Sequence, residues 1–196
     1  PPRRIVICQD CGHEFANPAP VKPLPCIFGG YEEDTPGTRI DGAFLEAALQ
    51  GIRTPGLRVL DMGCGIGRMV PQLTRLGFRP EDIVLLDSSR ACIEEVRKRF
   101  PAVTARVAEA TDPLLEVGEF DVVLMFEFLE HLAAPEVVVS RSVEALKGGG
   151  MLIVRGLPNN QSLEAFLAGA RWKMRAFPQH FQFFNPTTFQ RFLQRF

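Results

Sequence analysis

Short apolar runs alternate with amphipathic stretches through most of this chain. The runs are typical of buried strands and lie near 59–60, 83–86, 103–108, 120–126 and 151–154. Between them, apolar residues recur every three or four positions in the stretches 69–76, 92–100 and 138–145, which predicts amphipathic helices. This alternation predicts an α/β fold with a doubly wound, mainly parallel sheet that helices cover on both faces.

Two further segments show regular patterns outside this alternation. Residues 39–50 predict a helix on which Ile40, Phe44, Ala47 and Ala48 share one apolar face. Near the start of the chain, the apolar residues 5–7 predict a short strand.

A glycine-rich loop follows the first strand of the alternating region. Asp61 stands at the carboxyl end of that strand, and Gly63, Gly65 and Gly67 then make a tight turn into a helix. This strand–loop–helix unit is where open α/β sheets bind nucleotide-like ligands. A dinucleotide fingerprint would require a third glycine where Arg68 stands, so the pattern disfavours an NAD-dependent oxidoreductase.

A second acidic residue, Asp87, ends the strand 83–87. It lies ~20 residues beyond the glycine loop, where a carboxylate in dinucleotide sites accepts hydrogen bonds from both ribose hydroxyls. Asp87 therefore predicts a carboxylate anchor for the ribose of a nucleoside-containing ligand.

Composition narrows the classes of protein that fit. The 196 residues have the length of one domain, and 46% of them are hydrophobic, enough for a sizeable core. The net charge of −1 disfavours a broad nucleic-acid surface, and no apolar run approaches the ~20 residues of a membrane span. No signal peptide is visible, and five cysteines at irregular spacing do not indicate a disulfide framework, so we expect a cytoplasmic location.

Several ordered motifs resemble those of class I S-adenosylmethionine (SAM) methyltransferases. They are D-x-G-x-G-x-G at 61–67, Phe120-Asp121 at the start of a strand, and L-K-G-G-G-x-L-I-V at 146–154. The resemblance covers roughly 40–196 and implies a Rossmann-like fold with SAM as cofactor. Members normally continue with two antiparallel strands, which we expect this sheet to lack because the sequence ends at Phe196.

The resemblance also implies which residues contact SAM. Asp61 would hold its ammonium group, Asp87 its ribose, and Glu109 the amino group of its adenine. The full set of expected cofactor-binding residues is Asp61, Gly63, Cys64, Gly65, Gly67, Asp87, Ser88, Glu109, Ala110 and Phe126.

The segment after the strand 120–126 carries the pattern E-x-x-E-H, formed by Glu127, Glu130 and His131. It resembles the divalent-metal motif of ubiquinone-biosynthesis O-methyltransferases and of small-RNA 2′-O-methyltransferases, in which a later histidine also binds the metal. The resemblance implies a Mg²⁺ site of Glu127, Glu130, His131 and His180, with both histidines catalytic. Two alternatives stay open: His131 acts as a general base without metal, or the pattern only orients neighbouring structure.

The first 30 residues differ in character from the rest. Cys8 and Cys11 form a C-x-x-C that can present two thiolates to zinc, with His13 and Cys26 as nearby candidates for further ligands. The stretch resembles the second half of a small zinc ribbon that precedes some bacterial methyltransferases. We therefore expect a zinc-ribbon-like segment and linker at 1–30 and the methyltransferase domain at 31–196, with free thiols as the alternative to zinc.

The segment 156–196 is expected to face the substrate. After Glu164 it contains cations and aromatic residues but no acid, which favours a small, anionic acceptor; a solvated basic helix face is the alternative. The chain is thus expected to transfer a methyl group from SAM to a small-molecule hydroxyl. A carbon or nitrogen acceptor, or SAM binding without transfer, remains a competing hypothesis.

Overall fold

The computed structural model describes residues 4–17, 35–112, 117–176 and 179–196. The chain divides into two compact units. The sheet unit comprises Pro25–Phe126 and Ser140–Arg155, and the hairpin unit comprises Pro1–Leu24, Glu127–Val139 and Gly156–Phe196. The expected division into residues 1–30 and 31–196 stays a prediction, and Cys26 and most of the linker lie outside the described residues.

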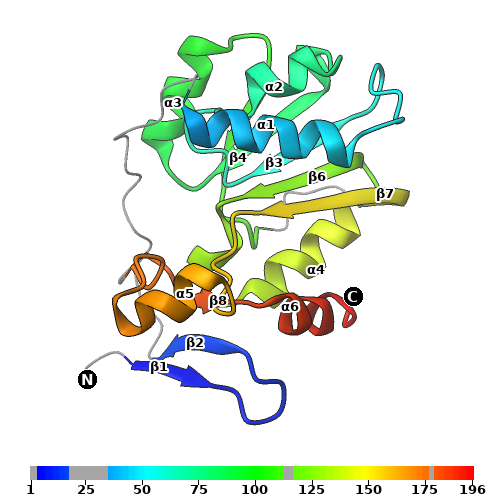
Figure 1. Ribbon diagram of the computed structural model, residues 1–196. Coiled ribbons are helices and arrows are strands. Elements are labelled where there is room, and N and C mark those ends of the chain that lie inside the picture. The colour runs from blue at the N-terminus through cyan, green and yellow to red at the C-terminus, as the bar shows by residue number, and fades with distance from the viewer. Residues whose placement is uncertain (1–3, 18–34, 113–116, 177–178) are drawn as a thin grey trace. The chain divides into compact units, whose positions relative to one another are not determined.

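A five-stranded sheet forms the centre of the sheet unit (Figure 1), with the strand order β5-β4-β3-β6-β7. Its strands are β3 (Val59–Met62), β4 (Ile83–Asp87), β5 (Thr104–Val107), β6 (Phe120–Phe126) and β7 (Leu146–Arg155). All neighbouring strands are parallel. From β3 the chain first adds strands on one side, β4 and β5, and then on the other, β6 and β7. At β3, Asp61 pairs with Leu85 on one side and with Leu124 on the other. This is the topological switch point at which such sheets bind ligands, and it confirms the predicted fold class.

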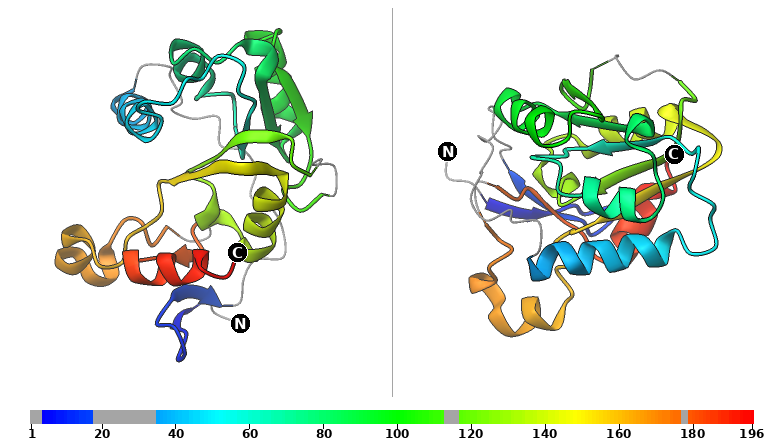
Figure 2. Two further views of the ribbon diagram at one scale, coloured as in Figure 1. Left: turned by 90° about the vertical axis from the view of Figure 1, so that its right-hand side faces the viewer. Right: turned by 90° about the horizontal axis from the view of Figure 1, so that it is seen from above.

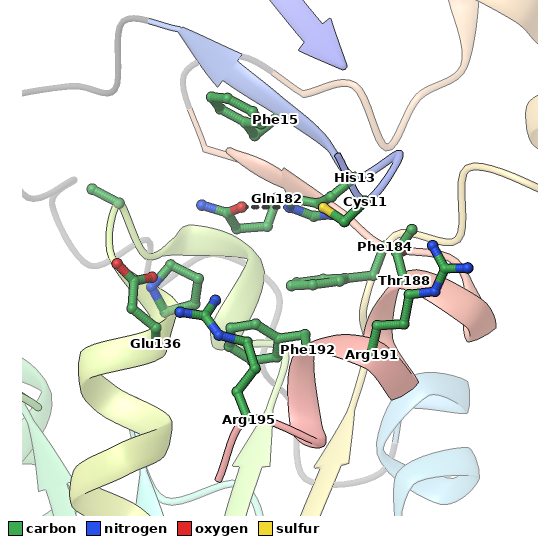
Figure 3. A pocket seen from close by; sticks show the side chains of 12 residues that line it. Cys11, His13, Phe15, Glu136, Gln182, Phe184, Thr188, Arg191, Phe192 and Arg195 are labelled. Carbon is green, nitrogen blue, oxygen red and sulfur yellow. Dashed lines mark hydrogen bonds between the residues drawn. The ribbon is translucent and has the colours of Figure 1, made fainter. Parts of the chain in front are cut away.

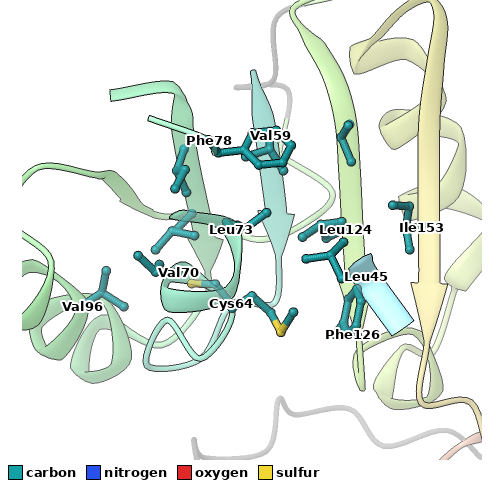
Figure 4. Close-up of a cluster of buried hydrophobic side chains, with 14 of the residues drawn as sticks. Leu45, Val59, Cys64, Val70, Leu73, Phe78, Val96, Leu124, Phe126 and Ile153 are labelled. Carbon is teal, nitrogen blue, oxygen red and sulfur yellow. The ribbon is translucent and has the colours of Figure 1, made fainter. Parts of the chain in front are cut away.

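Helices cover both faces of this sheet. The helices α1 (Pro36–Ala48), α2 (Val70–Arg75) and α3 (Arg90–Arg99) pack on one face around a shared apolar core (Figure 4). That face holds Val59 and Leu124, whereas Met62 points to the opposite face because side chains alternate along a strand. There Ser142 of α4 (Pro135–Ala145) lies 3.0 Å from the Met62 sulfur.

The helix α1 is present as predicted, but its apolar face is not the buried one. Ile40 and Phe44 are 58% and 42% exposed, whereas Asp41 and Leu45 are fully buried. Apolar spacing alone predicted that the wrong face of this helix would be buried. The buried Asp41 forms ion pairs with residues distant in the sequence, and local spacing does not indicate such pairs.

The strand β7 begins earlier than the sequence predicts. The sequence predicts a strand over 151–154, but the strand runs from Leu146 and bulges against β6, where Phe120 pairs with Leu146 and Val122 with Met151. Glycine allows the bulge: Gly149 has φ +80°, and a Cβ on Gly150 would lie 3.1 Å from the Asp121 carbonyl oxygen.

The hairpin unit contains a three-stranded antiparallel sheet in the order β1-β2-β8 (Figures 1 and 2). Its strands are β1 (Arg4–Ile7), β2 (Glu14–Asn17) and β8 (Gln182–Phe183), and its helices are α5 (Leu163–Ala168) and α6 (Pro186–Leu193). Among the described residues, single turns of 3₁₀ helix occur at η1 (Pro80–Asp82), η2 (Leu129–His131) and η3 (Gly169–Arg171). Among the described residues, no helix is both long and apolar enough to cross a bilayer.

Candidate cofactor site and candidate metal centre

The glycine loop is tied to the end of the neighbouring strand. The Gly63 amide donates to the Leu86 carbonyl oxygen at 2.8 Å, and the Gly65 amide donates to Asp87 Oδ2 at 2.9 Å. Gly63, Gly65 and Gly67 all have positive φ, which explains the three glycines. A Cβ on Gly67 would also lie 3.1 Å from the Phe100 ring, so the absence of a side chain at Gly67 lets the end of α3 pack closely against the glycine loop.

Asp87 organises the next loop as well. Its Oδ1 accepts from the Ser89 amide at 2.8 Å, and its carbonyl oxygen accepts from the Ala108 amide at 3.1 Å. The second bond brings the segment that contains Glu109 and Ala110 beside the end of β4. Each carboxylate oxygen keeps a free acceptor position, since an ionised carboxylate offers about four.

Asp61 is almost completely buried, with 2% of its surface exposed. Burial raises its pKa to about 7, while the Arg68 guanidinium opposes that rise and the Asp87 carboxylate adds to it. A cationic group bound at this carboxylate would lower the pKa again, which suits the expected role of Asp61 beside an ammonium.

The other predicted cofactor residues divide by burial. Cys64 is buried, and burial raises the pKa of its thiol well above the usual value, so it is not a nucleophile at neutral pH. Ala110 and Phe126 are also buried, whereas Ser88 and Glu109 are exposed. The structure thus places the glycine loop, Asp87 and the Glu109–Ala110 segment together, and their contacts to SAM stay a prediction.

In the hairpin unit, Glu127 has an unusual backbone. Its φ of +49° is the only positive value at a non-glycine position in the part of the chain that the structure describes. Gly156 packs directly against it, because a Cβ there would lie 2.5 Å from Glu127 Cγ and 2.9 Å from its amide nitrogen. A strained residue at the first position of E-x-x-E-H is a common feature of functional sites.

Glu130 is buried in η2 with 1% of its surface exposed. Burial raises its pKa to about 8, and the nearby Glu127 charge adds to this rise. Its Oε2 has no hydrogen-bond partner, although it is completely covered. A buried carboxylate oxygen without a partner is costly, so this atom is a candidate ligand for a cation.

Both predicted histidines are held through the same ring nitrogen. His131 Nδ1 lies 2.7 Å from the Gln179 carbonyl oxygen, and His180 Nδ1 lies 2.7 Å from that of Met174. Because a carbonyl oxygen only accepts, Nδ1 carries a proton in each ring, and in a neutral ring Nε2 then keeps its lone pair. Burial lowers the pKa of His180, which also favours its neutral form. Metal-binding histidines are commonly fixed in this way.

Three of the four predicted metal ligands meet in the hairpin unit. Potential ligand atoms of Glu130, His131 and His180 all lie within 4.8 Å of one another, and the two imidazole rings are 5.0 Å apart. Glu127 is outside this group, although its charge acts on both Glu130 and His180. Two imidazoles and a carboxylate suit Mn²⁺, Fe²⁺ or Zn²⁺, and a second carboxylate would be needed to favour Mg²⁺.

The C-x-x-C motif forms the turn between β1 and β2. The Cys8 amide donates to the His13 carbonyl oxygen at 2.8 Å, and the Gly12 amide donates to that of Cys8 at 2.9 Å. Hydrogen bonds from the Cys11 and Asp10 amides lower the pKa of the Cys8 thiol, as expected for a ready metal ligand. Both cysteines are free, and His13 Nε2 instead lies 2.8 Å from Gln182 Oε1.

One group of interacting residues was missed by the sequence reasoning. Asp41 forms ion pairs with Arg68, which directly follows the glycine loop, and with Arg155 at the end of β7. The one indication of this group in the sequence is Arg68, which stands where a dinucleotide fingerprint requires a glycine. Gly156 was also missed, and its steric role is visible only beside Glu127.

Comparison with known proteins adds family evidence. Residues 32–196 match a family described as methyltransferase domain. The chain is 33% identical over 131 residues to a ubiquinone biosynthesis O-methyltransferase of Chelativorans sp. (strain BNC1), covering 63% of this chain and 50% of that protein. The enzyme of the same name from Caulobacter sp. (strain K31) is 34% identical over 155 residues, with coverages of 72% and 60%. The chain therefore spans little more than half of these relatives.

A solved structure supports the fold. It is that of a SAM-dependent methyltransferase, described as a possible histamine N-methyltransferase, from Thermotoga maritima. The two chains superpose with a TM-score of 0.61 at 24% identity, over 81% of this chain and 71% of that one.

Proposed function

Since this chain belongs to the methyltransferase domain family, we propose that it transfers a methyl group from SAM to a hydroxyl group of a small molecule. The acceptor oxygen forms a bond to the methyl carbon as the bond from carbon to the sulfonium breaks, which leaves S-adenosylhomocysteine. The hydroxyl proton must pass to a base. The similarity to ubiquinone biosynthesis O-methyltransferases over 63% of the chain supports an oxygen acceptor.

In this proposal, the carboxyl end of the central strands holds SAM. Asp61 faces the ammonium group of SAM, Asp87 accepts from its ribose, and the glycine loop leaves room for its methionine portion. The bond from the Gly65 amide to Asp87 supports this assignment, because it sets the loop and the ribose carboxylate in one arrangement before a ligand arrives.

The observation that carries the oxygen chemistry is the cluster of Glu130, His131 and His180. In its neutral form each histidine offers the lone pair of Nε2, and the buried Glu130 Oε2, which has no hydrogen-bond partner, fits a bound cation. We propose a divalent metal here, held by these three residues with Glu127 as a further carboxylate. Such an ion would lower the pKa of an acceptor hydroxyl. Without metal, His131 or His180 can take the proton directly.

We also propose that the acceptor is anionic. The segment 165–196 contains five cations and no acid. Two of them are paired, Lys173 with Glu164 and Arg175 with Glu14. Arg171 is exposed, has no ion pair within the described residues and is available to an anion.

Two expectations from the sequence continue as proposals. A zinc ion held by Cys8 and Cys11 is supported by the thiolate-stabilising turn, and it requires further ligands because a structural site has four. Metal analysis of the purified protein before and after Cys8→Ser tests it, and unchanged zinc content would exclude this site. A cytoplasmic location also stays a prediction.

The experiment that tests the main proposal uses labelled SAM and pairs of acceptors that differ in one group. Isothermal titration first measures SAM binding. Label transfer is then screened on phenols, their methyl ethers and the corresponding anilines, each with and without a carboxylate. Transfer to the phenols alone supports O-methylation, and transfer to anilines would contradict it. SAM binding without any transfer would favour a binding protein.

A further inference from the structure

The hairpin unit contains a pocket with a volume of about 260 Å³ (Figure 3). It is lined by Cys11, His13, Phe15, Ala133, Pro135, Glu136, Gln182, Phe184, Thr188, Arg191, Phe192 and Arg195. None of these residues belongs to the cluster of Glu130, His131 and His180 or to the candidate cofactor site, although Cys11 and His13 are also candidate zinc ligands. Its volume is close to the ~300 Å³ at which small-molecule sites begin, which suits a ligand of one or two rings.

Four of the twelve residues that line the pocket carry aromatic rings. Phe15 comes from β2, Phe184 follows β8, and Phe192 comes from α6. The His13 ring lies 4.2 Å from the Phe184 ring, and its Nε2 is satisfied by Gln182. Flat aromatic faces of this kind favour an aromatic ligand body.

The charges around the pocket are unusual for the helix that carries them. Thr188, Arg191, Phe192 and Arg195 recur at spacings of three and four residues, so they form one stripe along α6 and the turn that follows it. A helix normally turns an apolar stripe toward its own protein. Here the stripe contains two arginines, which lie on either side of Phe192 (Figure 3).

Neither Arg191 nor Arg195 forms an ion pair among residues 4–17, 35–112, 117–176 and 179–196. Glu136, on the first turn of α4, also lines the pocket. Its negative charge offsets one of the two arginines, so these three side chains carry a net charge of about +1. Two guanidinium groups beside an aromatic cavity can bind a carboxylate or another compact anion with hydrogen bonds.

We propose that this pocket is a second ligand site, which binds a small aromatic monoanion. The ring lies among the three phenylalanines, and the anionic group meets Arg191 and Arg195. The proposal is independent of methyl transfer, because none of the residues that carry it belongs to the proposed reaction.

The test uses the whole chain and three probes with one ring system: 2-naphthoate, neutral 2-naphthamide and cationic 2-naphthylmethylamine. Isothermal titration is expected to detect naphthoate binding, with the amide about tenfold weaker and the amine weaker still. Arg191→Gln and Arg195→Gln should each weaken naphthoate binding about tenfold, and Glu136→Gln should strengthen it. Equal affinity for naphthoate and naphthamide would overturn the proposal.

Matched variants locate the site. Ala133→Phe fills the pocket and should abolish naphthoate binding, whereas Ala170→Phe, at an exposed position outside the lining, should not change it. Arg171→Gln removes an exposed arginine of the same unit that does not line the pocket, and affinity should again be unchanged. Loss of binding in Arg171→Gln, or in Glu130→Gln, with no effect of Ala133→Phe would place the anion elsewhere and contradict the proposal.

Discussion

Asp41 and Arg68 form a buried ion pair between α1 and the residue that follows the glycine loop. Arg68 Nη2 lies 2.8 Å from Asp41 Oδ2, and the Asp41 side chain has no exposed surface. Arg155, at the end of β7, also pairs with Asp41 and lies 5.7 Å from the centre of the Phe44 ring. One carboxylate thus joins the first helix, the glycine loop and an outer strand of the sheet unit.

Asp41→Asn is expected to destabilise the protein strongly. Removing one member of a buried charge network leaves the other charges without compensation, which costs about 3–5 kcal/mol. Denaturant unfolding measures the change, and we expect SAM affinity to fall as well, because Arg68 adjoins the loop. Glu46→Gln, at an exposed position of the same helix, is the control. A stability equal to that of the wild type would show that the pair has no structural role.

Asp87→Ala is expected to weaken SAM binding. The variant loses the ribose contacts, each worth about 1.5–3 kcal/mol, and also releases the Gly65 and Ser89 amides that hold the loop. Calorimetric titration with SAM should therefore show at least a tenfold rise in Kd. Glu94→Gln on the exposed surface of α3 controls for charge. Unchanged affinity in Asp87→Ala would remove this residue from the cofactor site.

Glu130 should make stability and metal binding depend on pH. Its pKa is raised to about 8 from the model-peptide value of 4.5, so the folded state keeps a proton that the unfolded state releases. Stability of the metal-free protein therefore falls as pH rises from about 4.5 to about 8, relative to Glu130→Gln. Unfolding curves of both proteins at several pH values test this, and parallel pH profiles would contradict the burial of an ionisable Glu130.

Metal binding has the opposite dependence on pH. A cation must displace the Glu130 proton, so its affinity should rise over the same pH range and level off above about 8. Titration of the chelator-treated protein with Mn²⁺, Mg²⁺ and Zn²⁺ measures it, with Glu130→Gln as the control. Affinity that does not depend on pH would place the metal at other residues.

Substitution of either histidine should impair turnover once an acceptor is known. His131→Ala and His180→Ala each remove an Nε2 lone pair, and kcat should fall by about 10²–10⁴ if the ring accepts the proton. Glu46→Gln, at an exposed position of α1, serves as the control. If a metal prepares the hydroxyl, chelator abolishes wild-type activity and Mn²⁺ or Mg²⁺ restores it. Full activity of both variants would exclude the histidines from the reaction.

The sequence was sufficient for much of the architecture because strand and helix patterns are local. The runs 83–87 and 120–126 were predicted with the bounds that the structure shows for β4 and β6. The hairpin partners β2 and β8 were not predicted. They pair across more than 160 residues, as Phe15 with Gln182, and each is too short to show an alternating pattern.

For the candidate sites, too, the sequence predicted some of the groupings and the tertiary structure supplied the others. Spacing alone brought Asp61, the glycine loop and Asp87 into one prediction, because carboxyl ends of parallel strands meet at one edge of a sheet. The family resemblance implied Glu127, Glu130, His131 and His180 as a second group, but only the tertiary structure placed His180 beside Glu130 and His131, through contacts that link η2 to the chain near β8.

The sequence by itself therefore determined the order of elements, the glycine loop and the chemical types available to each site. Tertiary structure decided which side of α1 is buried, which charges are paired and where a pocket forms. Local backbone preferences act over a few residues, whereas burial and ion pairing depend on neighbours brought together by the whole fold. Asp41 shows the difference: its sequence context predicts an ordinary helix position, and only Arg68 and Arg155 make its burial possible.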